Sequence, residues 1–161
     1  MKKLVLLLCV FVLLIAATGA VSAHNPQPAQ FTITGYTTDY SFQTGPNGRT
    51  WFHLTAEGTA AGYFNGPFTF EEWGVVDLDL TKEPPTGSGK GTNTGVITIT
   101  TTDGQERVRF VGVTDSVNVS GKFTVAPEDG SRGYAGLQGY GRYAGNAGLV
   151  FTVTFTGKFA D

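Results

Sequence analysis

The stretch GSRGYAGLQGYGRYAGNAG, residues 130–148, decides how the chain is interpreted, because its seven glycines and three tyrosines fit three different structures. A phosphate-binding loop needs glycines at a strand-to-helix turn, since the helix N-terminus supplies the anion site. Here the glycines lead into LVFTVTFTGKF, residues 149–159, which alternates apolar and polar residues as a strand does. Aromatic residues between the glycines disfavour a disordered tail. The stretch therefore predicts curved sheet, in which glycine lets the backbone bend or lets an aromatic ring lie across it.

Strand signals continue through the chain from Phe31 onward, and no window has a helical period. Asn-Gly and Asp-Gly turns recur at short intervals. The predicted strands are residues 31–43, 50–63, 67–80, 92–102, 105–114, 117–126, 136–144 and 147–159. These elements predict an all-β fold, a closed eight-stranded antiparallel up-and-down barrel that leaves no exposed sheet edge. A two-sheet β-sandwich is the alternative.

Alternation along each strand assigns one face to the interior. The residues expected to fill the interior are Phe52, Leu54, Ala56, Phe68, Phe70, Val76, Leu78, Leu80, Val117, Val119, Phe123, Val125, Leu149, Phe151, Val153, Phe155 and Phe159.

The N-terminal residues 1–23 have the basic start, apolar core and small-residue end of a secretory signal peptide. Cleavage after Ala23 would leave a flexible lead-in at 24–30 and a single barrel domain at 31–161, secreted to the extracellular space or the periplasm. Cys9 is the only cysteine and leaves with the signal, so no disulfide or thiol chemistry is expected. No membrane span is expected after cleavage.

The charge of the chain disfavours a nucleic-acid partner. The full sequence has 11 Lys and Arg against 13 Asp and Glu, a net charge of −2. No basic tract is present, and the basic patch typical of nucleic-acid-binding proteins is not predicted. Arg107 and Arg109 share a face of one predicted strand and are expected to be solvated surface charge.

Residues 130–143, GSRGYAGLQGYGRY, resemble the penultimate hairpin of the allene oxide cyclase-like and dirigent-like barrels. Those proteins carry a glycine, an aromatic residue and then Ala-Gly-(Ala/Leu)-x-Gly-x-Gly at this place, and a group of small secreted bacterial proteins has a similar pattern. Arg132 departs from it, standing where a small residue is usual. The resemblance implies the barrel fold, and its motif serves curvature and packing rather than chemistry.

Glu72 is the candidate catalytic residue. In FTFEEWGVVDL it lies in phase with Phe68 and Phe70, which would point it into the barrel, where a carboxyl needs hydrogen bonds and has a raised pKa. The resemblance to allene oxide cyclase-like barrels implies an interior glutamate that steers a bound apolar substrate, although no second catalytic residue matches by motif. The favoured interpretation is different: a bulge at Glu71 and Glu72, common beside a glycine, would leave Glu72 in solvent and Trp73 inside.

An apolar barrel interior also predicts a cavity for a small apolar ligand. Tyr36 and Tyr40 share a face of the first strand: pointing inward, their hydroxyls would orient a ligand, and pointing outward, their rings would stack on sugars. Ordinary packing is the third alternative. The residues expected to contact the ligand are Tyr36, Tyr40, Phe68, Phe70, Phe110 and Phe151.

The two histidines offer only a weak pattern for a metal. His24 would become the N-terminal residue after cleavage, and a copper site would need His53 as its partner, yet no spacing relates them. No metal and no cofactor is therefore predicted, and no Ser-His-Asp arrangement is visible.

Together these patterns predict a secreted barrel that binds a small apolar ligand in its interior and performs no covalent catalysis. One alternative is a cofactor-free cyclase or isomerase that uses Glu72. The other is a carbohydrate- or protein-interaction module that uses surface aromatic residues.

Overall fold

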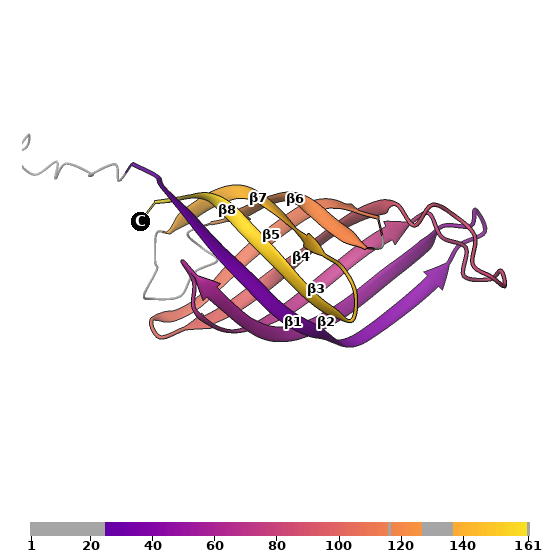
Figure 1. The fold of residues 1–161 in the computed structure, drawn as a ribbon, viewed down its shortest axis with the longest axis horizontal. Helices are drawn as coiled ribbons and strands as arrows, with labels where there is room; N and C mark the ends of the chain where they lie inside the picture. The colour runs from indigo at the N-terminus through magenta and orange to yellow at the C-terminus, as the bar shows by residue number, and fades with distance from the viewer. Residues whose placement is uncertain (1–24, 116, 127–136, 161) are drawn as a thin grey trace, which may run out of the picture.

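The computed structural model describes residues 25–115, 117–126 and 137–160, which form eight antiparallel strands closed into a barrel in sequence order (Figure 1). The strands are β1 (Gln27–Thr44), β2 (Thr50–Gly62), β3 (Gly66–Val76), β4 (Gly91–Thr101), β5 (Gly104–Thr114), β6 (Asn118–Val125), β7 (Gln138–Asn146) and β8 (Val150–Ala160). Closure occurs between β1 and β8. The predicted up-and-down barrel is confirmed, and the sandwich alternative is wrong. The glycine-rich stretch is sheet where it forms β7, whereas residues 1–24 and 130–136 lie outside the described residues.

The two ends of the barrel differ, and we call them the closed end and the open end. β1 begins and β8 ends at the closed end, on the left of Figure 1. The connections β1–β2, β3–β4, β5–β6 and β7–β8 lie at the open end, on the right. The closed end is filled by aromatic rings, each less than 2% exposed: Phe31, Phe64, Phe123 and Phe155. Phe31 stacks on Phe155 with ring centroids 4.6 Å apart, so the described side chains fill this end of the barrel with packed aromatic rings.

A β-bulge in β1 reverses the alternation along that strand. The β1–β2 register shifts between Thr37 and Asp39, so that two residues of β1 oppose one residue of β2. Tyr36 lies before the shift and faces outward, whereas Tyr40 lies after it, pairs with Leu54 and shares its inner side. The prediction that Tyr36 and Tyr40 share a face is therefore wrong. Beyond Thr37, whose N–H donates to the Leu149 carbonyl, the strand pairs only with β2, so this part of the hairpin overhangs the open end.

Most of the predicted interior is confirmed. The residues buried as expected are Ala56, Phe68, Val76, Phe123, Val125, Phe151, Val153, Phe155 and Phe159. Those that are half-buried are Phe52, Leu54, Phe70, Leu78 and Val119. Leu80, Val117 and Leu149 are exposed, so their predicted positions are wrong. The three strands concerned, β3, β6 and β8, are shorter than predicted, and each of these three residues belongs to a connection at the open end.

Tyr143 shows why the sheet needs glycine. Its buried ring lies across Gly121, where an added Cβ would be 2.7 Å from the Tyr143 ring and 2.2 Å from the carbonyl oxygen of Val111. Gly112 pairs with Gly121, and a Cβ added at Gly112 would lie 2.3 Å from the Tyr143 hydroxyl oxygen. No side chain larger than hydrogen fits at either position, so the sequence-based role of glycine as a seat for aromatic rings is confirmed here.

Candidate functional site

A pocket of about 90 Å³ opens at the open end of the barrel. Its walls are mostly apolar and include Phe52, Leu54, Phe70, Val119 and Phe151. Phe70 forms part of its floor, because it stacks on the buried Phe110 with ring centroids 5.3 Å apart. The pocket therefore ends halfway down the barrel, above the aromatic filling of the closed end.

Among the described residues, Glu72 is the only charged side chain that lines this pocket, and it is just 7% exposed. The β2–β3 register runs without a shift along β3, so no bulge occurs at Glu71 and Glu72. Trp73, which the bulge would have placed inside, is 41% exposed on the outer surface. The favoured bulge interpretation is wrong, and the inward alternative for Glu72 is correct. Gly74 instead leaves room for the Phe52 ring, because a Cβ added at Gly74 would lie 2.3 Å from that ring.

Three side chains from three strands form a chain of hydrogen bonds through the interior. The Tyr143 hydroxyl donates to Oδ1 of Asn93 at 3.2 Å. The Asn93 amide donates through Nδ2 to Oε1 of Glu72 at 2.6 Å. Since the Tyr143 hydroxyl occupies Oδ1, it fixes the orientation of the amide and directs the NH₂ group at the carboxyl group. We call this arrangement the Tyr143–Asn93–Glu72 relay.

The second carboxyl oxygen of Glu72 faces the pocket. Within the described residues Oε2 accepts no hydrogen bond, and it is not among the fully enclosed polar atoms that lack a partner. It therefore keeps accessible area, and Glu72 lines the pocket. A ligand in the pocket can meet this oxygen directly.

Burial decides the protonation of the relay. It raises the pKa of Glu72 from 4.5 to about 7, against the opposing effect of the hydrogen bond from Asn93. Burial also raises the pKa of Tyr143 to about 12, so its hydroxyl keeps its proton at neutral pH. With its pKa raised into the neutral range, the Glu72 carboxyl can donate a hydrogen bond to a ligand when protonated and accept one when ionised.

The residues predicted to contact a ligand fall into three groups. Phe70 and Phe151 line the pocket, as the prediction requires of a contact residue. Phe68 and Phe110 are buried beneath these two and do not line it. Tyr36 is half-exposed on the outer surface, where its hydroxyl donates to Glu57, so its predicted interior role is wrong because it precedes the β1 bulge. Tyr40 is exposed on the overhanging hairpin, beside Phe42 at 5.5 Å.

Asn93 and Tyr143 were missed by sequence reasoning, although the alternation contains the signal. Asn93 is in phase with Gly95 and Ile97, and Tyr143 is in phase with Gly141. An amide at an inward position needs a partner, which would have indicated a polar group inside the barrel.

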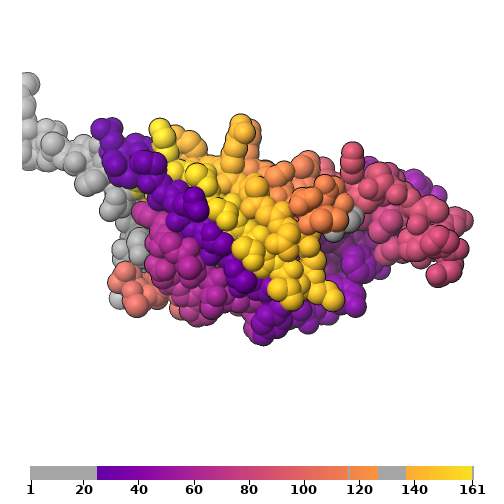
Figure 2. Space-filling model, in the orientation of Figure 1, coloured from indigo at the N-terminus to yellow at the C-terminus, as the bar shows by residue number. Residues whose placement is uncertain are grey.

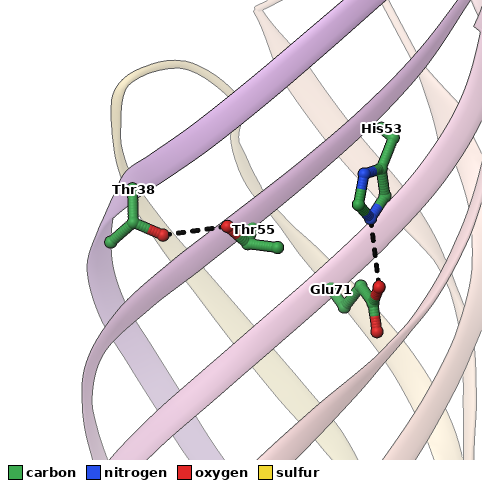
Figure 3. Close-up of polar contacts among 4 residues, drawn as sticks. All are labelled: Thr38, His53, Thr55 and Glu71. Atoms are coloured by element: carbon green, nitrogen blue, oxygen red, sulfur yellow. Dashed lines mark hydrogen bonds and ion pairs between the residues drawn. The ribbon is translucent and has the colours of Figure 1, made fainter.

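The outer surface of β1–β3 holds a second group of polar contacts (Figure 3). Nε2 of His53 lies 3.0 Å from Oε1 of Glu71, and the Thr38 and Thr55 hydroxyls are 3.0 Å apart. The His53 ring also stacks on Trp73 with centroids 5.4 Å apart. His24, the other proposed copper ligand, lies outside the described residues. Within the described part of the chain, no three His, Cys, Asp or Glu side chains come together as a metal site.

A comparison with protein-family models finds no match. A comparison with curated proteins finds no similar sequence either. The resemblance to allene oxide cyclase-like and dirigent-like barrels therefore stays a prediction. No helix in the described ranges is long and apolar enough to cross a membrane.

Proposed function

We propose that the protein is a secreted, non-catalytic binder of a small apolar molecule, which enters the open end of the barrel and places one polar group against Glu72. The observation that carries this proposal is a buried carboxyl group, Glu72, that lines a mostly apolar pocket and has a hydrogen-bond partner within the described residues for Oε1 alone. Pockets that bind small molecules combine mostly apolar walls with a few polar groups that fix the orientation of the ligand.

The size of the pocket limits what it can enclose. A cavity of about 150 Å³ holds a molecule of the size of benzene, and this pocket measures about 90 Å³. The ligand is therefore expected to insert one end and to leave the rest outside. Tyr40 and Phe42 on the overhanging hairpin supply exposed apolar surface for that outer part, together with Leu149, which lies beside β1.

The test is binding of Nile red, an uncharged apolar dye that fluoresces when it leaves water, followed by displacement with a medium-chain alcohol. Wild type is expected to bind the dye and to release it to the alcohol. At pH 8.5 Glu72 is ionised, because its pKa is about 7. Glu72→Gln is then expected to weaken binding of the alcohol roughly tenfold, since a charge-assisted hydrogen bond becomes a neutral one. Glu71→Gln, the neighbouring change on the outer surface, is the matched control and is expected to have no effect. Equal effects of the two variants, or no dye binding, would contradict the proposal.

A second function, proton transfer by Glu72, is favoured by one observation: a carboxyl with a pKa near 7 stands at the end of the relay and faces the pocket. Such a group can take a proton from carbon and return it elsewhere, as an isomerase does. The test is conversion of a small β,γ-unsaturated cyclic ketone to the conjugated isomer, followed by ultraviolet absorbance. Glu72→Gln is expected to abolish turnover while the barrel stays folded, and unchanged turnover in this variant would sink the isomerase alternative.

A further inference from the structure

The positive charges of the described strands gather on one half of the outer barrel wall. The outward positions of β5–β8 hold no Asp or Glu, and their five cations are all exposed: Arg107, Arg109, Lys122, Arg142 and Lys158. The carboxylates of the outer wall lie across the barrel on β1–β3: Asp39, Glu57 and Glu71. The net charge of −2 conceals this separation.

Four of these cations are neighbours in the sheet. Lys122 of β6 stands directly opposite Arg142 of β7. Arg109 of β5 and Lys158 of β8 occupy the diagonal positions on either side of that pair. We call these four residues the cationic face. Arg107 is not included, because it lines a hollow on the other side that also contains Glu57 and Glu71.

The Lys122–Arg142 pair does not help the barrel to fold. Like charges directly opposite each other destabilise a sheet, and no carboxylate occupies an outward position on these strands to separate them. Two adjacent cations are instead suited to an anion, since an arginine fork matches the geometry of a carboxylate or sulfate group.

A shallow hollow of about 510 Å³ lies beside the Lys122–Arg142 pair and is lined by both side chains. It exists because the outward side chains of Ser120 and Ala144 are small and leave the wall low at this place. Its rim carries Lys122 and Arg142, and three hydroxyl side chains complete it: Ser120, Thr154 and Thr156. In Figure 2 the yellow surface of β8 lies beside the indigo surface of β1, with the orange surface of β6 beyond it.

Tyr140 adds an aromatic ring to the cationic face. It is 58% exposed, pairs with Lys158 and points outward two residues before Arg142. An exposed aromatic ring offers a flat apolar surface on which a sugar ring can lie.

We propose that the cationic face binds an acidic polysaccharide, a flexible chain of sugars that bear carboxylate or sulfate groups. Adjacent cations match its anionic groups, the Ser and Thr hydroxyls match its hydroxyls, and Tyr140 matches a sugar ring. The outer wall of a barrel is convex, so a flexible chain can follow it whereas a rigid nucleic-acid duplex touches it at few points. The acidic residues on β1–β3 repel a polyanion from the opposite wall and direct it to this one.

The experiment measures the affinity of the protein, purified as its host processes it, for polygalacturonate and for dextran sulfate by isothermal titration calorimetry. Uncharged dextran and single-stranded oligothymidylate are the comparison ligands. Both acidic polymers are expected to bind, and affinity is expected to fall steeply between about 50 mM and about 200 mM salt, as counterion release requires. Uncharged dextran is expected not to bind.

The variants locate the binding face. The double variant Lys122→Gln/Arg142→Gln is expected to lower the affinity roughly tenfold and to reduce the slope of log affinity against log salt by about two. The matched control, Lys82→Gln/Lys90→Gln, removes the same charge from the β3–β4 connection and is expected to change affinity less than about twofold. Tyr140→Ala is expected to weaken binding with an unchanged salt slope.

Three results would overturn the proposal. An equal loss in the control double variant would show that only net charge matters. Binding of uncharged dextran as tight as that of the acidic polymers would remove the role of the cations. Tighter binding of oligothymidylate than of either acidic polysaccharide would assign the face to nucleic acid instead.

Discussion

Glu106 gives the fold an unusual dependence on pH. Its side chain is fully buried in β5, and neither carboxyl oxygen has a hydrogen-bond partner in the structure as described. The inward positions of the described strands hold one other charged side chain, Glu72, which lies near the opposite end. Burial raises the pKa of Glu106 from 4.5 to about 7. The ionised carboxylate therefore costs the folded state about 3 kcal/mol, at about 1.4 kcal/mol per pKa unit.

The sign of the effect follows from proton binding. Below pH 4.5 the group is protonated in both states and stability does not depend on it. Between 4.5 and about 7 the unfolded chain loses the proton and the folded chain keeps it, so stability falls as pH rises, and the loss is complete above the folded pKa. The predicted perturbation is Glu106→Gln, which keeps the shape and removes the charge. The amide group that this substitution introduces is buried without a partner at every pH. The free energy that it costs therefore cancels when the stabilities at two pH values are compared.

The assay is urea unfolding of wild type and of Glu106→Gln at pH 4 and pH 8.5, which bracket the two pKa values of 4.5 and about 7. The free energy of unfolding of wild type is expected to fall by about 3 kcal/mol more than that of the variant over this range. This difference corresponds to roughly 10 °C in Tm. Glu72 contributes equally to both proteins, so the comparison isolates Glu106. Parallel pH profiles for the two proteins would refute the reasoning.

Three further substitutions test the packing and the surface. Tyr143→Phe removes the hydroxyl that donates to Asn93 and is expected to lower the free energy of unfolding in urea by about 1–2 kcal/mol. It is also expected to change the pKa of Glu72, measured by carbon-13 NMR. An unchanged stability would contradict the relay. Gly121→Ala places a methyl group against the Tyr143 ring and is expected to cost about 1–3 kcal/mol or to prevent folding, so wild-type stability would contradict the close approach. Glu71→Gln removes the negative charge from the exposed contact with His53 and is expected to change stability by less than about 1 kcal/mol, and a larger loss would mean that this contact is structural.

The barrel could be predicted because its strands alternate in the sequence and its turns carry glycine with Asn or Asp. The β1 bulge could not be predicted, since Thr37, Thr38 and Asp39 are all polar and an inserted polar residue leaves no mark on the pattern. Tyr36 faces outward by ordinary alternation from Phe31 and Ile33, and the bulge puts Tyr40 on the other face, which explains why the prediction of a shared face failed.

The charge pattern shows a different limit of sequence reasoning. Arg109, Lys122, Arg142 and Lys158 are separated by a dozen residues or more, so no basic tract is visible along the chain. Only the antiparallel register of β5–β8 brings them together. The absence of a basic tract therefore excluded a contiguous basic segment, and it did not exclude a cationic surface.

The central claim is that the open end of the barrel holds an apolar ligand, and native mass spectrometry of the protein from its own growth medium tests it most directly. Val119→Phe fills the pocket, and Val113→Phe, on the outer wall, is its matched control. The account predicts an excess mass that denaturation releases, present in wild type and Val113→Phe and lost in Val119→Phe. A bare mass in all three proteins, or an excess mass that Val119→Phe retains, would contradict it.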